Sequence, residues 1–362
     1  MRTFTIKFGQ KRLRFADRMI KEDDENKWWI IPLLIGVYLM PSVFGDYTIY
    51  LMNLIAVAII AAVALDMLCG VCGQLSLGHA AFIGIGAYSY GILHMTFHIG
   101  CISSLLLSGC VGALVSLLIG IPSLRLKGLY LAIMTMGFVY ITDESIRYFS
   151  KWTNGVEGFR VSRTMDLGFI EMKSSSIEFY YFIFTVVIAV VILSRFLLDS
   201  KLGRAFISIR DSDTAAEVSG VNLLLYKVLA FAISSFMAAF AGGLMGIIIG
   251  TISPEDFNIM LSINYLVMLV VGGMGAIYGA VIGAVFIVFL PEWIVRLRDA
   301  FLSAGADVSV IQYMVYGLVI LVFIVFEPHG IYGRWLVIKN YFKKFPLNEK
   351  RIGRLAWILR WR

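Results

Sequence analysis

The chain has 362 residues, of which 59% are hydrophobic and 15% are charged, and its formal net charge is +7. A soluble domain usually carries about 25% charged residues, whereas the mean hydropathy here is +0.84. This composition excludes an ordinary soluble protein and predicts an all-α integral membrane protein with several spans, in which lipid covers much of the surface.

Positive charge gathers at the two ends of the chain. Residues 1–27 are basic before an acidic patch at 22–25, and residues 328–362 are rich in lysine and arginine. Basic segments next to membrane spans are typical of the cytoplasmic face, where they lie beside anionic lipid; nucleic-acid binding is the weaker alternative. We therefore expect cytoplasmic tails at 1–27 and 328–362 around a transmembrane permease domain at 28–327.

About ten transmembrane helices are expected from the apolar runs. An even number places both ends on one side, and lysine and arginine in the short loops place that side in the cytoplasm. The expected spans cover, approximately, residues 28–44, 47–68, 70–97, 101–121, 128–143, 179–198, 227–250, 259–271, a ninth ending at 291, and 310–326.

Two glycine-rich segments, residues 70–91 and 271–284, carry polar groups within these apolar runs. Small residues let helices approach closely, and interrupted segments in corresponding places of two halves indicate a central path. The segments therefore predict two pseudo-symmetric five-helix halves with glycine-broken or re-entrant helices. The candidate pathway residues are Gln74, Ser76, His79, Gly272, Gly273, Gly275 and Tyr278.

Free backbone groups at 74–78 and 272–279 would suit a small zwitterion, because N–H groups attract a carboxylate and C=O groups attract an ammonium. The apolar walls suit a hydrophobic amino acid, but urea or another small polar solute fits the same pattern. His79 is either packed, with a hydrogen bond to a carbonyl, or functional. In a carrier or channel working alone, His79 or Asp66 would titrate.

The polar loop at 199–226 is the expected docking surface for an ATPase chain. No G-x-x-x-x-G-K-[ST] motif occurs, so the chain is expected to be no enzyme and to bind no ATP itself. Cys69 and Cys72 lack a second ligand pair, so no metal or cofactor is expected. An A-A-E-x-x-G arrangement predicts a short helix ended by glycine, and a plain solvated loop is the alternative. Its residues are Ala215, Ala216, Glu217 and Gly220.

Five stretches resemble the permease subunits of high-affinity branched-chain amino acid ABC importers, of the type that carries G-Q-L-S-L-G-H. In chain order they are GQLSLGHAAFIGIGAYSYG, IRDSDTAAEVSGVNLLLYKVLAFAISS, ISPEDF, VVGGMGAIYGAVIGAVF and EPHGIYGRW. The resemblance covers about residues 45–335 and leaves the two tails outside it.

This resemblance implies a subunit of an ATP-driven importer in a prokaryotic plasma (inner) membrane. The implied partners are a second permease subunit, two ATP-binding subunits that hold ATP and Mg, and an extracytoplasmic solute-binding protein. In this family the loop Ala215–Gly220 would contact the ATPase. Relatives in the family carry urea or short-chain amides, so the solute stays open between these and branched-chain amino acids.

Overall fold

The structure is a computed structural model that describes residues 45–123, 126, 128–166, 171–301 and 330–343, with Tyr38, Pro41 and a few positions between 314 and 327. The tail at 1–27 lies outside these residues, as does nearly all of the expected span at 28–44, and only scattered positions of the expected span at 310–326 are described. The described part is built mainly of α-helices, with π-helical and 3-10 turns and two short antiparallel strand pairs.

The helices up to the middle of the chain are α3 (Asp46–Asp66), the π-helix η3 (Met67–Val71), α4 (His79–Gly91), the π-helix η4 (Ile92–Thr96), α5 (Cys101–Ser123), α6 (Leu129–Tyr148), α7 (Ser150–Thr153) and the 3-10 turn η5 (Gly155–Glu157). The later helices are α8 (Ile177–Asp199), α9 (Lys201–Asp211), α10 (Asp213–Val218), α11 (Leu223–Ile249), the 3-10 turn η6 (Pro254–Phe257), α12 (Ile259–Gly272), α13 (Ile277–Phe301) and α15 (Gly330–Lys343).

Within the described residues, 6 helical segments are long and apolar enough to cross a membrane. This confirms an all-α protein with several spans, and the expected runs at 47–68, 101–121, 179–198 and 227–250 correspond to α3, α5, α8 and α11. Two boundaries predicted from the sequence are wrong. Residues 72–78 are not helical, which agrees with the expected glycine-broken helix, but α4 begins at His79 and not at residue 70. The span expected to end at 291 continues as α13 through Pro291 to Phe301.

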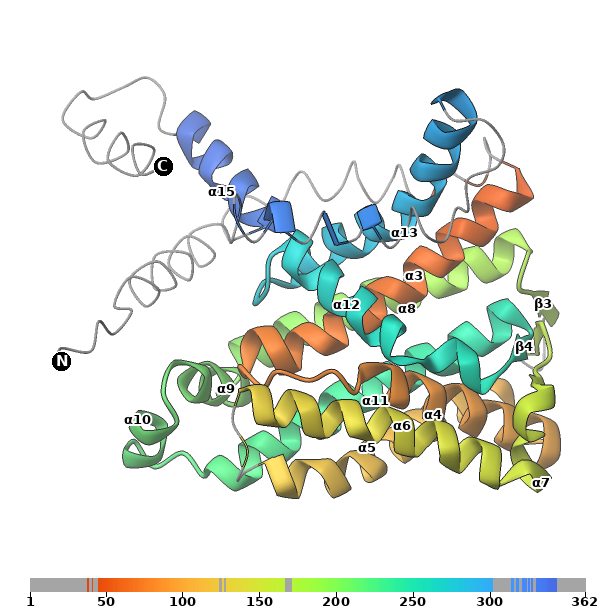
Figure 1. The fold of residues 1–362 in the computed structure, drawn as a ribbon, viewed down its shortest axis with the longest axis horizontal. Helices are drawn as coiled ribbons and strands as arrows, with labels where there is room; N and C mark the ends of the chain where they lie inside the picture. Colours follow the sequence, from red (N-terminus) through yellow and green to blue (C-terminus); the bar gives the residue numbers. More distant parts are fainter. Residues whose placement is uncertain are drawn as a thin grey trace.

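The two ends of the helix bundle differ in structure (Figure 1). The short helices α9 and α10 lie at one end, on the left of the view, and the strands with α7 lie at the other. There β1 (Phe159–Arg160) pairs with β4 (Thr251–Ile252), and β2 (Thr164–Asp166) pairs with β3 (Glu171–Lys173), both antiparallel. We call these ends the α10 end and the β3 end.

Helices α3 and α11 form the centre of the core. The apolar window of α3 is 94% buried, compared with 22% for α8, and α11 packs against α3, α4 and α5. Close approach depends on glycine. A Cβ added to Gly86 of α4 would lie 1.9 Å from the carbonyl oxygen of Ala239, and one added to Gly242 of α11 would lie 2.0 Å from that of Ile83. The sequence prediction of close backbone contact in this segment is confirmed.

Candidate functional site at the α10 end

The two glycine-rich segments meet at the α10 end of the bundle. We call residues 72–78, between η3 and α4, the first break, and residues 273–276, between α12 and α13, the second break. A Cβ added to Gly70, just before the first break, would lie 2.4 Å from the backbone nitrogen of Gly275 in the second. Segments about 200 residues apart in sequence therefore touch through backbone.

A buried carboxylate joins the two breaks. Asp66, the last residue of α3, is fully buried, and its Oδ1 accepts a hydrogen bond of 2.7 Å from the N–H of Gly275. Its Oδ2 is buried and has no hydrogen-bond partner among the described residues. Arg210, near the end of α9, donates from Nη1 to the carbonyl oxygen of Gly70 at 3.1 Å.

Hydroxyl groups satisfy the backbone N–H groups around the first break. The N–H of Leu77 donates to Thr135 Oγ1 at 2.9 Å, and that of Ala80 donates to Ser262 Oγ at 2.9 Å. The N–H of Gly78 donates to Ser76 Oγ at 3.2 Å. The sequence suggested that such groups would be free to attract a solute carboxylate. In this structure these three are paired within the chain, as buried N–H groups usually are.

His79 is packed into the core by the helices on either side of it. Its Nε2 lies 2.8 Å from the carbonyl oxygen of Ala61 in α3, and its ring meets that of Tyr265 edge to face at 5.3 Å. This is the packed arrangement, with a hydrogen bond to a carbonyl, that the sequence offered as one alternative. Gln74 instead lines a cavity of about 340 Å³ between the first break and the α9–α10 junction.

The second break is a tight turn between two candidate spans. Gly272 ends α12, Gly273 has a φ of +114°, and Gly275 has a φ of +82°. Helix α15, the last of the described helices, packs on this turn, because a Cβ on Gly330 would lie 2.4 Å from the nitrogen of Gly273. The rings of Tyr278 and Tyr332 are 6.0 Å apart. The sequence marked EPHGIYGRW as a motif but gave no reason to place it here.

The A-A-E-x-x-G arrangement forms α10, a short helix with defined ends. The Ser212 side chain accepts from the N–H of Ala215 and caps its start. At its end, Gly220 has a φ of +83° and donates to the carbonyl of Glu217, while Val221 donates to that of Ala216, which is a Schellman motif. Ala216 is buried and Glu217 and Gly220 are exposed. The predicted short helix ended by glycine is confirmed.

A buried ion pair ties α10 to α11. Lys227 Nζ lies 3.0 Å from Asp213 Oδ2, and the two side chains are 2% and 16% exposed. Asp213 is the first residue of α10, whereas Lys227 lies in the second turn of α11. Val218, at the other end of α10, is 90% exposed. The helix thus presents an apolar tip outward and is held at its base by a charge pair.

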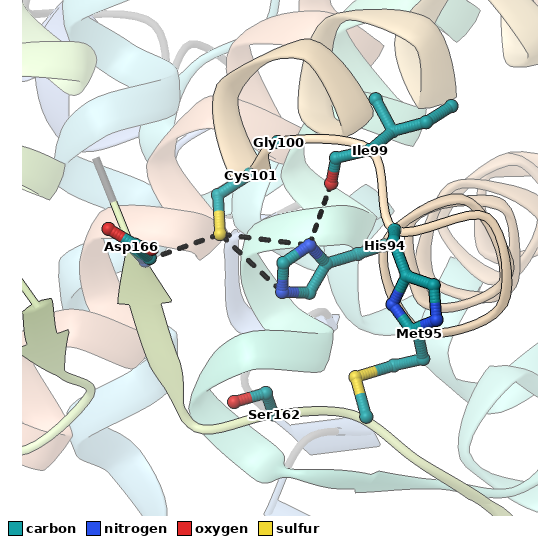
Figure 2. Close-up of a pocket in the computed structure, with 8 residues that line it drawn as sticks. His94, Met95, Ile99, Gly100, Cys101, Ser162 and Asp166 are labelled. Atoms are coloured by element: carbon teal, nitrogen blue, oxygen red, sulfur yellow. Dashed lines mark hydrogen bonds between the residues drawn. The ribbon is translucent and has the colours of Figure 1, made fainter. Parts of the chain in front are cut away.

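A different cavity, of about 370 Å³, lies at the β3 end (Figure 2). Cys101 Sγ lies 3.6 Å from His94 Nε2 and accepts a hydrogen bond of 3.3 Å from the N–H of Asp166. His94 Nδ1 is 2.9 Å from the carbonyl oxygen of Ile99. No group of three His, Cys, Asp or Glu residues in the described ranges could hold a metal ion. These contacts fasten the start of α5 to β2.

Comparison with known proteins assigns the chain to a family. Residues 47–324 match the family model described as the permease component of the branched-chain amino acid transport system. The chain belongs to this family. The residues of both breaks and of α10 fall inside the matched range, so the site at the α10 end is part of the permease itself.

Individual relatives of this permease occur in bacteria and archaea. It is 30% identical over 290 residues to the high-affinity branched-chain amino acid transport system permease protein LivM of Escherichia coli K12, covering 74% of this chain and 68% of that protein. It is 27% identical over 288 residues to LivH of Salmonella typhimurium, covering 75% and 90%. The probable LivM of Methanocaldococcus jannaschii is 22% identical over 249 residues, covering 67% and 71%. No solved structure matches the permease.

Proposed function

We propose that this chain is a transmembrane pathway subunit of an ATP-driven importer of branched-chain amino acids. Membership of the permease family supports transport, and the names of the relatives favour branched-chain amino acids over urea or short-chain amides. The observation that carries the proposal is α10, a capped helix with an exposed tip whose base is ion-paired to α11 beside the two breaks.

The position of α10 also indicates which end of the bundle would face the cytoplasm. The ATPase that the proposal requires would dock at α10, so the α10 end would face the cytoplasm. Charge does not distinguish the two ends, because Lys201 and Arg204 at the α10 end are matched by Arg160 and Lys173 at the β3 end. Both termini are then cytoplasmic, in a prokaryotic plasma membrane, with ten spans in two five-helix halves. The partners would be a second permease subunit, two ATP-binding subunits that hold ATP and Mg themselves, one of which docks at α10, and an extracytoplasmic solute-binding protein at the β3 end.

The solute would pass along the side of the bundle where the breaks lie. Gln74 lines the cavity at the first break, and Tyr278 follows the second. Gly272, Gly273 and Gly275 shape the turn there without side chains. Ser76 and His79 hold the structure around the first break. The carbonyl contact of His79 disfavours a carrier working alone with this residue as its titrating group.

Bulk at the end of α10 is expected to stop transport. Gly220 has a φ of +83° and nothing within 4 Å of an added Cβ, so a Gly220→Trp side chain would project into the space of a docked ATPase. Radiolabelled leucine uptake by the full complex in proteoliposomes should fall at least about ten-fold, a coupling loss of roughly 1.4 kcal/mol.

Gly220→Asn is the control for this substitution, because asparagine tolerates positive φ and is small. Its uptake should stay within about two-fold of the unsubstituted complex. Normal ATP-driven uptake by Gly220→Trp, in a complex that is assembled and inserted, would contradict the role of α10.

A further inference from the structure

Three elements meet around the backbone of Gly70 at the α10 end. The carboxylate of Asp66 leaves the end of α3, the guanidinium of Arg210 arrives from α9, and the turn at Gly275 approaches from the second break. Arg210 and Gly70 are 140 residues apart in the sequence, and Asp66 and Gly275 are 209 residues apart. The contact therefore exists only in the folded permease.

Two glycines, Gly73 and Gly275, leave room for the side chain of Arg210. A Cβ on Gly73 would lie 2.9 Å from Arg210 Cγ, and one on Gly275 would lie 3.1 Å from Arg210 Nη1. Gly73 and Gly275 also have φ values of +73° and +82°, which residues with a side chain rarely adopt. Glycine at both positions lets the guanidinium pass between the two breaks.

Asp66 is the hydrogen-bond acceptor for the second break beside Gly70. A buried carboxylate is costly unless it is paired or hydrogen-bonded. Here Oδ1 holds the N–H of the second break, and Oδ2 is buried without a hydrogen bond from the described residues. Hydrogen bonds to a charged group are roughly twice as strong as neutral ones, so the carboxylate fixes the turn at Gly275 firmly.

Arg210 belongs to the segment that carries α10. Only Asp211 separates it from Ser212, which caps α10, and from there the ion pair of Asp213 leads to α11. The cavity of about 340 Å³ lies between this junction and the residues Cys72, Gly73 and Gln74 of the first break. The α9–α10 junction can therefore shift relative to the break without first displacing packed core.

We propose that Asp66 and Arg210 are positioning residues that carry movement of the α9–α10 segment to both breaks at once. Arg210 holds the carbonyl of Gly70 just before the first break and lies against Gly275 of the second break, whose N–H is held by Asp66, so a shift of α9 acts on both breaks. This inference rests on the proposed function, because it assigns how an ATPase docked at α10 acts on the pathway.

The test uses the complete transporter in proteoliposomes, with leucine uptake and ATP hydrolysis measured on the same preparation. Asp66→Asn keeps an oxygen for the N–H of Gly275 and removes the charge, and Arg210→Gln removes the positive charge. For each, uptake should fall at least about ten-fold while hydrolysis stays within about two-fold, since α10 still docks. Arg195→Gln removes a guanidinium that pairs with Asp199 within α8 at 3.5 Å, so it is the matched control and should leave both rates unchanged.

A double variant covers the case in which one single variant does not assemble. Asp66→Asn with Arg210→Gln leaves no unpaired buried charge, so it should assemble, hydrolyse ATP and still fail in uptake, with a defect no larger than that of the worse single variant. Coupled uptake within about two-fold of the unsubstituted transporter in Asp66→Asn, or in the double variant, would overturn the proposal. Failure of the unsubstituted transporter to use ATP would instead overturn the proposed function.

Discussion

Replacing Gly86 with valine is expected to lower the stability of the folded permease strongly. The first added atom would lie 1.9 Å from the carbonyl oxygen of Ala239 and 2.4 Å from its Cα. Backbone cannot move aside as a side chain can, so α4 and α11 must separate where they pack against each other. We expect a loss of about 3 kcal/mol of stability, at the upper end of the cost of overpacking.

Thermal unfolding in detergent and the monodisperse fraction after extraction measure this effect. Gly137→Val is the matched control, because Gly137 of α6 is exposed and nothing lies within 4 Å of an added Cβ. Its unfolding temperature should match that of the unsubstituted chain. If Gly86→Val unfolds at the same temperature as Gly137→Val, α4 and α11 do not pack as closely at Gly86 as the structure shows.

Replacing Lys227 with methionine is expected to separate ATP hydrolysis from transport. Methionine fills similar space but leaves Asp213, which is 16% exposed, without its partner at 3.0 Å. The cost should be about 2 kcal/mol, less than that of breaking a fully buried pair because water reaches Asp213. The base of α10 then loses its tie to α11, so leucine uptake should fall about ten-fold while hydrolysis continues.

Two further variants distinguish the loss of the ion pair between Lys227 and Asp213 from the loss of a positive charge. Lys201→Met removes an exposed lysine from the neighbouring helix α9 and should leave both rates unchanged. Asp213→Asn with Lys227→Met removes both charges and should restore thermal stability toward that of the unsubstituted chain, but not uptake. Full uptake by Lys227→Met would show that this pair does not transmit force.

Local patterns predicted the parts of this fold that depend on neighbouring residues. Apolar runs predicted α3, α5, α8 and α11, because the length needed to cross a bilayer is read from consecutive residues. The glycine at position 220 is a local signal too, and it predicted the end of α10 correctly, whereas the cap from Ser212 is a local signal that the sequence prediction did not use. The small residues near Gly86 indicated close helix contact for the same reason.

The arrangement of the candidate site depends on contacts distant in sequence. Nothing near Asp66 indicates that its partner is the N–H of Gly275, and nothing near Ala80 indicates Ser262. The sequence therefore left N–H groups free for solute that the folded chain pairs with its own hydroxyls. The role of α15 was missed likewise, since Gly330 matters through its contact with Gly273. A basic terminal segment alone suggested only a tail.

The most direct test compares the chain alone with the assembled transporter. Proteoliposomes would contain either this permease by itself or the permease with its partner permease, ATPase pair and binding protein, each loaded with ATP and Mg on the α10 side. We predict leucine accumulation against its gradient only in the complete assembly, and none when a non-hydrolysable ATP analogue replaces ATP. Leucine flux through the purified chain alone, independent of ATP, would contradict the account.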